Sequence, residues 1–305
     1  MATIAARARI VSATRFLGLA IASASSLFLV VTSGAFVRLT GSGLGCDNWP
    51  RCGDKPYPER GFHAFVEFGN RMVALVALVM TLVTWIGARR TEGLSTTGRR
   101  TALAAFLVVA AQIPLGAVTI ALDLHPLAVM AHFLLGLTAL ALAVVVAIEA
   151  LLLTEGRAEP VDPSWLRKLV VWAGVPACAA LVVSGAVATA SGPHPGADDG
   201  VKRLGVAITD TVYVHVRVAA AFGIGVLVVG WFLARARHRY PGVFVLWALL
   251  VGALACQAVI GEVQYRNALP WGLVLLHVAL AATIWVLTVG IAYILWRPPR
   301  RLARQ

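Results

Sequence analysis

Residues 127–152 read LAVMAHFLLGLTALALAVVVAIEALL, and this stretch decides the class of fold. At the rise of about 1.5 Å per residue of an α-helix, it is long enough to cross a hydrocarbon layer of about 30 Å. His132 and Glu149 are its only ionisable residues. Because a backbone in lipid must satisfy its own hydrogen bonds, the stretch predicts a membrane-spanning helix.

Seven further apolar runs of similar length recur along the 305-residue chain. The eight runs together cover about residues 16–37, 62–88, 101–122, 127–152, 169–190, 209–234, 243–262 and 271–295. The chain is 59% hydrophobic and only 13% charged, with a mean hydropathy of +0.83. Such a composition excludes a soluble enzyme, a secreted disulfide scaffold and a disordered tail. The sequence therefore predicts an all-α polytopic membrane protein with eight transmembrane helices.

The basic residues are distributed unevenly between the two sets of loops. The formal net charge is +12, but the 26 Lys and Arg residues lie mostly in short segments between apolar runs, so nucleic acid is not the expected partner. Most of them fall on the side that holds the two termini, and the positive-inside rule then places both termini in the cytoplasm. Arg7 and Arg9 before the first run also resemble the start of a signal peptide. Because Arg15 interrupts that run and its apolar part continues to Val37, we expect a retained helix.

Polar positions of the first half recur in the second half at a constant distance. Four pairs lie 145 residues apart: Asn70 and His215, Gln112 and Gln257, Gly116 and Gly261, and His132 and His277. Ser33-Gly34-Ala35 recurs as Ser184-Gly185-Ala186 at an offset of 151, which a longer first outer loop explains. The repeat predicts two pseudo-symmetric four-helix bundles in parallel orientation, because each contains an even number of spans. The polar segment 154–164 places their boundary between domains 1–158 and 159–305.

Three histidines lie at a similar depth in their spans, about five or six residues from the outer end. They are His132, His215 and His277, and each is expected to lie roughly 8–9 Å below the outer boundary. Two imidazoles from neighbouring helices of a bundle can bind both axial positions of a haem iron, which His215 and His277 suit. The alternative is a buried histidine hydrogen-bonded to the next helix. A zinc or copper site is less expected, since no cysteine shares the layer in the second half.

Span 62–88 carries a polar face near the same level. His63, Glu67 and Asn70 follow an i, i+4, i+7 pattern and so lie on one side of the helix. Glu67 is either a proton donor or acceptor, the reading we favour, or the ion-pair partner of Arg71. Arg71 and Arg217 either extend toward the interface or pair with haem propionates. Glu149 lies near a cytoplasmic helix end, where we expect a solvated side chain.

The four cysteines divide into two pairs with different expected roles. Cys46 and Cys52 lie in the first outer loop, and their short spacing on the oxidising side suits a disulfide. The loop around them is rich in turn-forming residues and can cover a site beneath it. Cys178 and Cys256 fall within spans, where cysteine acts as a small apolar residue.

Several motifs together resemble the haem A synthases of bacteria and mitochondria. They are GAFVRLTGSGLGCDNWPRC at 34–52, VEFGNR at 66–71, AHF around His132, and the histidines His215 and His277. The resemblance implies eight helices in two halves and an oxidoreductase that converts the C8 methyl of haem O to the formyl group of haem A for terminal oxidases, by successive hydroxylations.

The resemblance also implies a role for each half. In the second half, His215 and His277 would hold a haem b, with Arg217 beside it. In the first half, His132 would bind the iron of haem O, Glu67 would lie near the reacting methyl, and Arg71 would belong to the same site. Cys46 and Cys52 would form the outer-loop disulfide of the family.

One position departs from the pattern of the resemblance. Many members carry a histidine where Asn70 stands, and an amide is a poor iron ligand. Either His63, on the same face two turns away, replaces the missing ligand, or the iron is five-coordinate through His132, which we favour. A cysteine pair in the outer loop of the second half, present in some relatives, is missing here, and we expect His194 in that loop to be solvated.

Two other classes of function compete with this reading. A membrane b-type cytochrome that acts only in electron transfer explains His215 and His277 but leaves Glu67 unused. A transporter of haem or another small molecule is the third reading, because repeats and buried charges also mark transporters. As a synthase, the protein is expected in the bacterial plasma membrane, with a haem O synthase and an electron acceptor as partners.

Overall fold

The structure is a computed structural model that describes residues 10–46, 49–197 and 200–303. Arg7 and Arg9, considered above as part of a signal peptide, lie outside the described residues, as do Asp47 and Asn48 of the outer-loop motif. All eight predicted spans are helices long and apolar enough to cross a membrane. Within the described ranges no strand is present. The prediction of an all-α polytopic membrane protein is confirmed.

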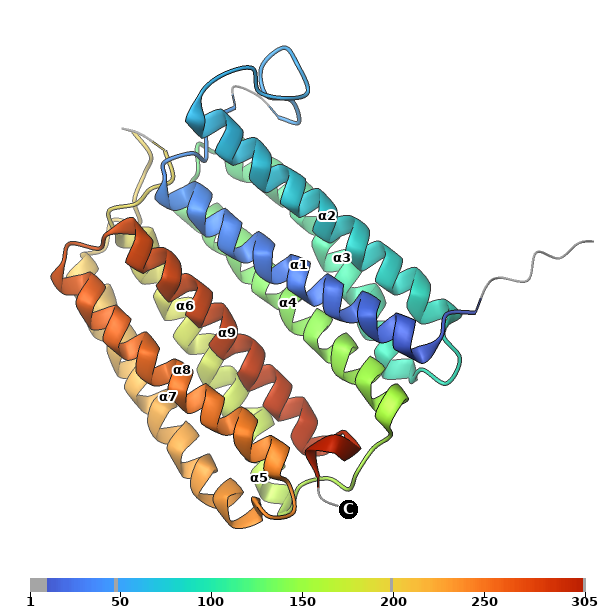
Figure 1. Ribbon diagram of the computed structural model, residues 1–305. Helices are drawn as coiled ribbons and strands as arrows, with labels where there is room; N and C mark the ends of the chain where they lie inside the picture. The colour runs from blue at the N-terminus through green and yellow to red at the C-terminus, as the bar shows by residue number, and fades with distance from the viewer. Residues whose placement is uncertain (1–9, 47–48, 198–199, 304–305) are drawn as a thin grey trace, which may run out of the picture.

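The helices of the first half are α1 (Ala13–Leu39), α2 (Phe62–Arg90), α3 (Thr96–Ala121) and α4 (Pro126–Glu155). The second half begins with α5 (Ser164–Leu169), a π-helical turn at Val170–Gly174 and α6 (Val175–Ser191), which together form one span. It continues with α7 (Ile208–Ala236), α8 (Pro241–Arg266) and α9 (Trp271–Trp296), and a short 3₁₀ turn follows at Arg300–Leu302. Figure 1 shows the spans as one set of roughly antiparallel helices.

Local sequence signals explain several helix ends. Ser95 precedes α3, and its hydroxyl accepts a hydrogen bond of 2.9 Å from the amide of Gly98, a typical N-cap. Pro126 and Pro241 open α4 and α8, where proline loses no helical hydrogen bond. Gly156 ends α4 with φ of +79°, a conformation that favours glycine.

Each half closes into a ring of four neighbouring helices. In the first half α1 contacts α2 and α4, and α3 contacts α2 and α4; in the second half α6 to α9 repeat this arrangement. The halves meet through α4 and α9, with α1 against α9 and α6 against α4 (Figure 1). Because α1 corresponds to α6 and α4 to α9, these contacts are related by a pseudo-two-fold axis between α4 and α9. Such pairs support the predicted duplication.

The turns at the outer helix ends repeat as well. Asp123 and Leu124 have φ of +47° and +58°, and Ala268 and Leu269, at the equivalent positions, have φ of +58° and +59°. Positive φ is uncommon in non-glycine residues, so its recurrence at the same register is informative. The Leu124 amide donates to the Thr119 carbonyl at 2.9 Å, and the Leu269 amide donates to the Gln264 carbonyl at 2.8 Å. The two turns are therefore copies of one another.

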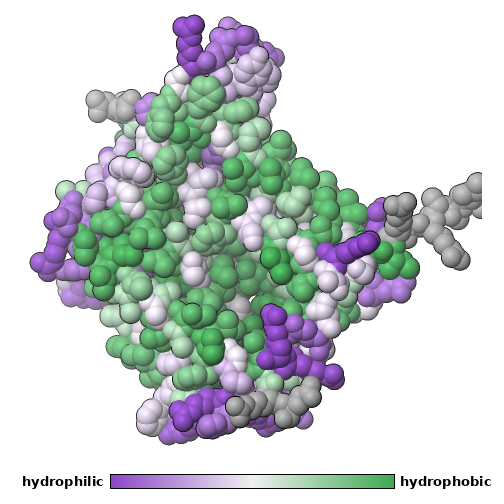
Figure 2. Space-filling model, in the orientation of Figure 1, coloured by the Kyte–Doolittle hydropathy of each residue, from purple (hydrophilic) through white to green (hydrophobic). Residues whose placement is uncertain are grey.

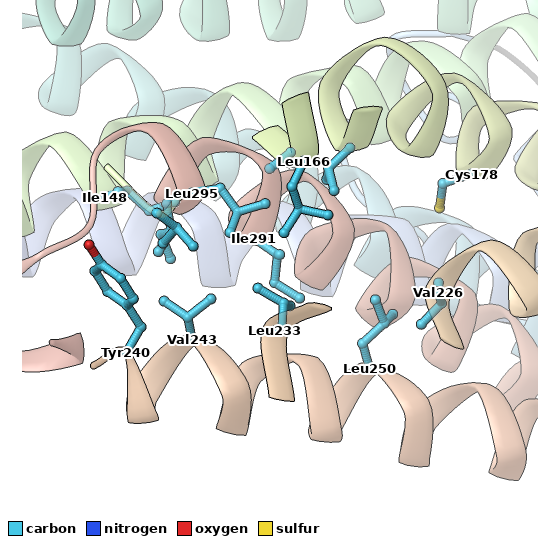
Figure 3. Close-up of a cluster of buried hydrophobic side chains, with 14 of the residues drawn as sticks. Ile148, Leu166, Cys178, Val226, Leu233, Tyr240, Val243, Leu250, Ile291 and Leu295 are labelled. Atoms are coloured by element: carbon cyan, nitrogen blue, oxygen red, sulfur yellow. The ribbon is translucent and has the colours of Figure 1, made fainter. Parts of the chain in front are cut away.

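The apolar core of the second half lies toward the end of the bundle that carries the C-terminus. Figure 3 shows side chains of α4 to α9 converging there, including Leu166, Val243, Leu250 and Leu295. In α7 the core begins at Phe222, and in α9 it begins with Ala282 and Ile284, one to two turns beyond the histidines of these helices. The described residues form no buried apolar cluster at the histidine level of this half.

The surface agrees with a membrane location. On the face shown in Figure 2, hydrophobic residues cover the middle, and hydrophilic residues gather toward the two loop-bearing ends. The spans least buried within the protein include α8, of which 11% of the apolar window is buried, whereas α4 and α9 reach 44%. The central pair α4 and α9 therefore packs against protein, and the outer helices leave broad apolar faces for lipid.

The expectation of a solvated Glu149 is wrong. Its side chain is 1% exposed, and its Oε1 pairs with Arg297 at 2.7 Å and accepts a hydrogen bond from the Tyr293 hydroxyl. Its Oε2 accepts a hydrogen bond from the Ser95 hydroxyl. The end of α9 and the start of α3 thus enclose a carboxylate that, from its place near the end of α4, would face water. A buried charge needs such partners, and here they connect the two halves.

Candidate functional site

The second half brings His215 of α7 and His277 of α9 together. Their ring centres lie 6.4 Å apart, with 62° between the ring planes. Metal–imidazole bonds are about 2 Å long, so two imidazoles on opposite sides of one metal ion have ring centres about 6 Å apart. The spacing of this pair therefore suits axial ligation of a single iron. The same spacing also occurs in edge-to-face contacts between aromatic rings, so haem ligation by this pair stays a prediction.

A serine fixes the orientation of His215. The Ser184 hydroxyl donates its single hydrogen to the Leu181 carbonyl at 2.8 Å and lies 2.9 Å from His215 Nδ1. With the hydroxyl hydrogen directed to the Leu181 carbonyl, the tautomer that completes the contact carries its hydrogen on Nδ1 and leaves the lone pair of Nε2 for a metal. A hydrogen bond of this kind orients a metal ligand and raises its basicity.

Glycines of neighbouring helices form the seats of the histidine rings. A Cβ added to Gly185 would lie 3.0 Å from His215 Cε1, and one added to Gly261 would lie 3.2 Å from His277 Cε1. Both distances are tighter than ordinary contacts, so larger residues would displace the rings. The Gln257 amide nitrogen also donates to the His277 carbonyl at 3.0 Å. The repeated glycines and glutamines of the sequence thus surround the ligands.

The first half contains the same arrangement with one change. The Gln112 amide nitrogen donates to the His132 carbonyl at 3.0 Å, and a Cβ on Gly116 would lie 3.4 Å from His132 Cε1. Across the bundle, the Ser33 hydroxyl donates to Asn70 Oδ1 at 2.7 Å. Ser33 is the counterpart of Ser184, so Asn70 occupies the place that His215 has in the second half.

Among the described residues, four buried polar atoms that occupy equivalent positions in the two halves have no hydrogen-bond partner. They are the Nδ1 atoms of His132 and His277 and the Oε1 atoms of Gln112 and Gln257. The Nδ1 atoms of both histidines lie beside the glycine seats, so Nε2 is the nitrogen left for a metal. The described residues contain no cluster of three or more His, Cys, Asp and Glu side chains suited to a bare metal ion. Two imidazoles at one level of the bundle would suit a haem, whose macrocycle supplies the remaining iron ligands.

Glu67 lies at the outer end of this layer in the first half and is 5% exposed. Its Oε2 accepts a hydrogen bond of 2.8 Å from the Cys46 amide, and its Oε1 is paired with Arg71. Arg71 also donates to the Pro50 and Arg51 carbonyls at 3.1 Å and 2.8 Å. The expected disulfide between Cys46 and Cys52 is present. The ion pair, which we considered as the alternative to chemistry, therefore exists and holds the disulfide loop over the bundle.

His63 contacts the same loop rather than Asn70. Its Nδ1 lies 2.9 Å from the Ser42 hydroxyl, and Gly45 packs directly against the His63 backbone, where no Cβ would fit. Along the helix axis, the seven residues between His63 and Asn70 span roughly 10 Å. The structure thus places His63, Glu67 and Asn70 on one face but at different heights.

Arg217 extends over the exposed ring of Tyr213, one turn away on α7. Its guanidinium carbon lies 3.0 Å from the ring centre, and its NH1 donates to the Tyr213 carbonyl at 3.1 Å. Neither contact involves His215 or His277, so a propionate-binding role for Arg217 stays a prediction.

The outer loop of the second half is tied to the first half. His194 is not solvated as expected, because its Nε2 lies 2.8 Å from the Leu269 carbonyl and its own carbonyl accepts from Arg38. Arg38 also donates to the Thr189 carbonyl at 3.0 Å, and the Gly43 amide donates to the Gly196 carbonyl. The role of Arg38 could not be predicted, since its partners are backbone carbonyls more than 150 residues along the chain.

Comparison with known proteins adds a family. The model of the COX15-CtaA family, described as cytochrome oxidase assembly protein, matches residues 18–64 and 57–289. A protein of Shewanella oneidensis named heme A synthase is 24% identical over 322 residues, which cover 90% of this chain and 95% of the relative.

Two further relatives, from Symbiobacterium thermophilum and Geobacillus kaustophilus, are also named heme A synthase. Each is 31% identical, and the alignments span 37% and 33% of the length of these relatives. They correspond to 37% and 34% of this chain. Because the family model matches most of the sequence, the chain belongs to the COX15-CtaA family of cytochrome oxidase assembly proteins, the haem A synthase family.

Proposed function

We propose that this protein is a haem A synthase that oxidises the C8 methyl of haem O to a formyl group. One observation carries the proposal: the two halves hold equivalent layers, one with two facing imidazoles and one with a single imidazole beneath a buried carboxylate. An electron-transfer cytochrome would need only the first layer. The names of the relatives support the same reaction.

The second half is proposed to bind haem b through Nε2 of His215 and Nε2 of His277. When bound, this haem supplies one-electron transfer. Ser184 holds the His215 ring in the ligating tautomer, and Gly185 and Gly261 leave the room that the two rings need. The buried apolar core of this half begins one to two turns away from the layer, so the layer itself is lined by histidines, glycines and a glutamine.

The first half is proposed to bind haem O, with His132 as an iron ligand. Conversion of a methyl to a formyl group removes two hydrogen atoms and adds one oxygen atom, a four-electron oxidation that takes place by successive hydroxylations. Protons leave the reacting carbon during this change. A carboxylate near the methyl can accept a proton at an Oε atom or stabilise a developing positive charge, and Glu67 is the buried carboxylate at this end of the bundle.

The contacts of Glu67 suit such a role because they fix its position. The Cys46 amide and Arg71 each bind one carboxylate oxygen, and both belong to the network that holds the disulfide loop. A group held in this way needs little reorganisation during reaction. The loop also covers the end of the bundle and limits the access of water to the carboxylate.

The partners follow from the proposed reaction. A haem O synthase would supply the substrate, terminal oxidases would use the product, and an electron acceptor would collect the electrons. The positive-inside distribution of Lys and Arg supports a bacterial plasma membrane protein with both termini in the cytoplasm.

The experiment exchanges Glu67 for Gln in a host that makes haem O but lacks its own haem A synthase. We expect Glu67→Gln to reduce the haem A extracted from membranes by 10²-fold or more, because general acid–base groups contribute on this scale. The matched control is Glu262→Gln. Glu262 also pairs with an arginine four residues on, at the outer end of α8, but it is exposed. Full haem A formation by Glu67→Gln would remove Glu67 from the chemistry.

A further inference from the structure

The two histidine layers are close copies, and the difference in their ring-bearing side chains concerns one side. On the side of α9 and α4, His277 and His132 have equivalent surroundings. Each has a glutamine that donates to its backbone carbonyl and a glycine against its Cε1 atom. On the α7 and α2 side, the serine partner is retained, but His215 is matched by Asn70. The second half thus offers an imidazole on each side of an iron, whereas the first half offers an imidazole only on the side of His132.

Asn70 brings a different chemistry to that side. Its Oδ1 lies 2.7 Å from the Ser33 hydroxyl, whose oxygen also lies 3.2 Å from the Val30 carbonyl, so the single hydroxyl hydrogen serves one of two acceptors. Unlike an imidazole, the amide of Asn70 has no nitrogen lone pair for iron, and its N–H groups can donate hydrogen bonds. A Cβ on Gly34 would lie 4.0 Å from this oxygen, an ordinary contact, whereas the counterpart on Gly185 would crowd the His215 ring at 3.0 Å. The side chain of Asn70 is therefore smaller than the space that the repeat provides for a ligand.

No other histidine of this half is placed to fill the position. His63 lies two turns away on α2, and its Nδ1 is bound to Ser42 in the outer loop. His125 precedes α4 at the N-cap, almost two turns before His132, on the helix that already supplies the ligand of the opposite side.

We infer that the first half binds its haem through His132 alone and holds, beside Asn70, an open iron position for a diatomic ligand such as O₂. The inference rests on the proposed placement of haem O in this half. The amide N–H groups of Asn70 would donate to the bound ligand, as the open position and a neighbouring donor together select small ligands of this kind. The ligand pair of the second half would leave its iron closed.

The test uses carbon monoxide as the probe on the full-length protein. Purified protein in detergent is titrated with haem B to saturation, reduced with dithionite and exposed to carbon monoxide. We expect two haems per chain, one low-spin and unreactive and one that binds carbon monoxide. Asn70→His should convert the second haem to a low-spin form and reduce its carbon monoxide affinity at least ten-fold.

Two further variants keep the result interpretable. Asn267→His adds a histidine at the exposed C-terminal end of α8 and should leave carbon monoxide binding unchanged. Asn70→Ala removes the amide but adds no ligand, so carbon monoxide should still bind and dissociate faster. The low-spin spectrum of the second-half haem reports in every variant whether the protein is folded.

The inference is overturned if the wild-type protein, saturated with haem, shows no haem that binds carbon monoxide, whether it holds one haem or two. It is equally overturned if Asn70→His binds carbon monoxide as the wild type does. Formation of haem A is measured separately. If the protein binds carbon monoxide but makes no haem A, the open iron position stands and the proposed reaction is wrong. If it makes haem A but binds no carbon monoxide, the proposed reaction stands and the open iron position is wrong.

Discussion

Replacement of Glu149 by Ala tests whether the buried carboxylate joins the two halves. The substitution removes an ion pair with Arg297 and hydrogen bonds with Tyr293 and Ser95 at once. Removal of one partner of a buried pair costs about 3–5 kcal/mol, because the remaining charge loses its compensation. Arg297 is 28% exposed and can be partly solvated, so the lower end of that range, about 3 kcal/mol, applies.

The measurement is the thermal unfolding midpoint of the purified protein in detergent. An unfolding entropy of about 2.1 cal/mol/K per residue gives about 0.6 kcal/mol/K for 305 residues, so a loss of about 3 kcal/mol in Glu149→Ala is expected to lower the midpoint by roughly 5 °C. The matched control is Glu155→Ala at the same end of α4. Its ion pair with Arg301 is 3.2 Å long, but the two side chains are 28% and 60% exposed. Pairs of this kind contribute about 0–1 kcal/mol, so the control should melt within about 2 °C of wild type.

The reasoning is refuted if the two variants melt at the same temperature. That result would mean that Arg297 and Tyr293 find water or other partners without loss. Glu149→Gln separates charge from shape, since the amide keeps the size of the side chain and one hydrogen-bond acceptor. We expect its midpoint to lie between those of Glu149→Ala and the wild type.

Two further perturbations probe the layers and the loop. Ser184→Ala removes the acceptor of the His215 Nδ1–H, and loss of such a partner weakens metal binding about 10–100-fold. Haem b should therefore pass from this variant to apomyoglobin faster by a comparable factor. Ser33→Ala is the control, and equal transfer rates of the two variants would contradict the tautomer argument. Reduction of the Cys46–Cys52 disulfide should expose the outer loop to proteases while the helices stay intact. The measurement is the rate of proteolytic cleavage near residue 50. An unchanged rate would show that Glu67 and its partners hold the loop without the disulfide.

Much of the fold could be predicted from the sequence because lipid imposes simple constraints. A run of about 20 apolar residues has few alternatives to a helix in a bilayer, and all eight spans agree with the expected ranges within a few residues. The repeat of His132 and His277 gave the register of the halves. The similar depth of His215 and His277 in spans of one bundle correctly predicted that they come together.

The remaining features depend on contacts between distant segments. Glu149 looked solvated because its position on α4 is near a helix end, but Tyr293 and Arg297 of the other half cover it. The Ser33-Gly34-Ala35 repeat signalled the duplication, yet the role of its serine as a partner of Asn70 required the packing of α1 on α2. The ion pair of Glu67 and Arg71 was visible in their spacing, but its hold on the disulfide loop was not.

The haem content of the wild-type protein tests the central claim most directly. The protein is purified from a host that makes haem O and no haem A, and its haems are extracted and separated by chromatography. The account predicts haem B together with haem A or a hydroxylated form of haem O, from a protein with one site in each half. Haem B alone, with haem O unchanged in the membranes, would contradict a synthase and favour an electron-transfer cytochrome.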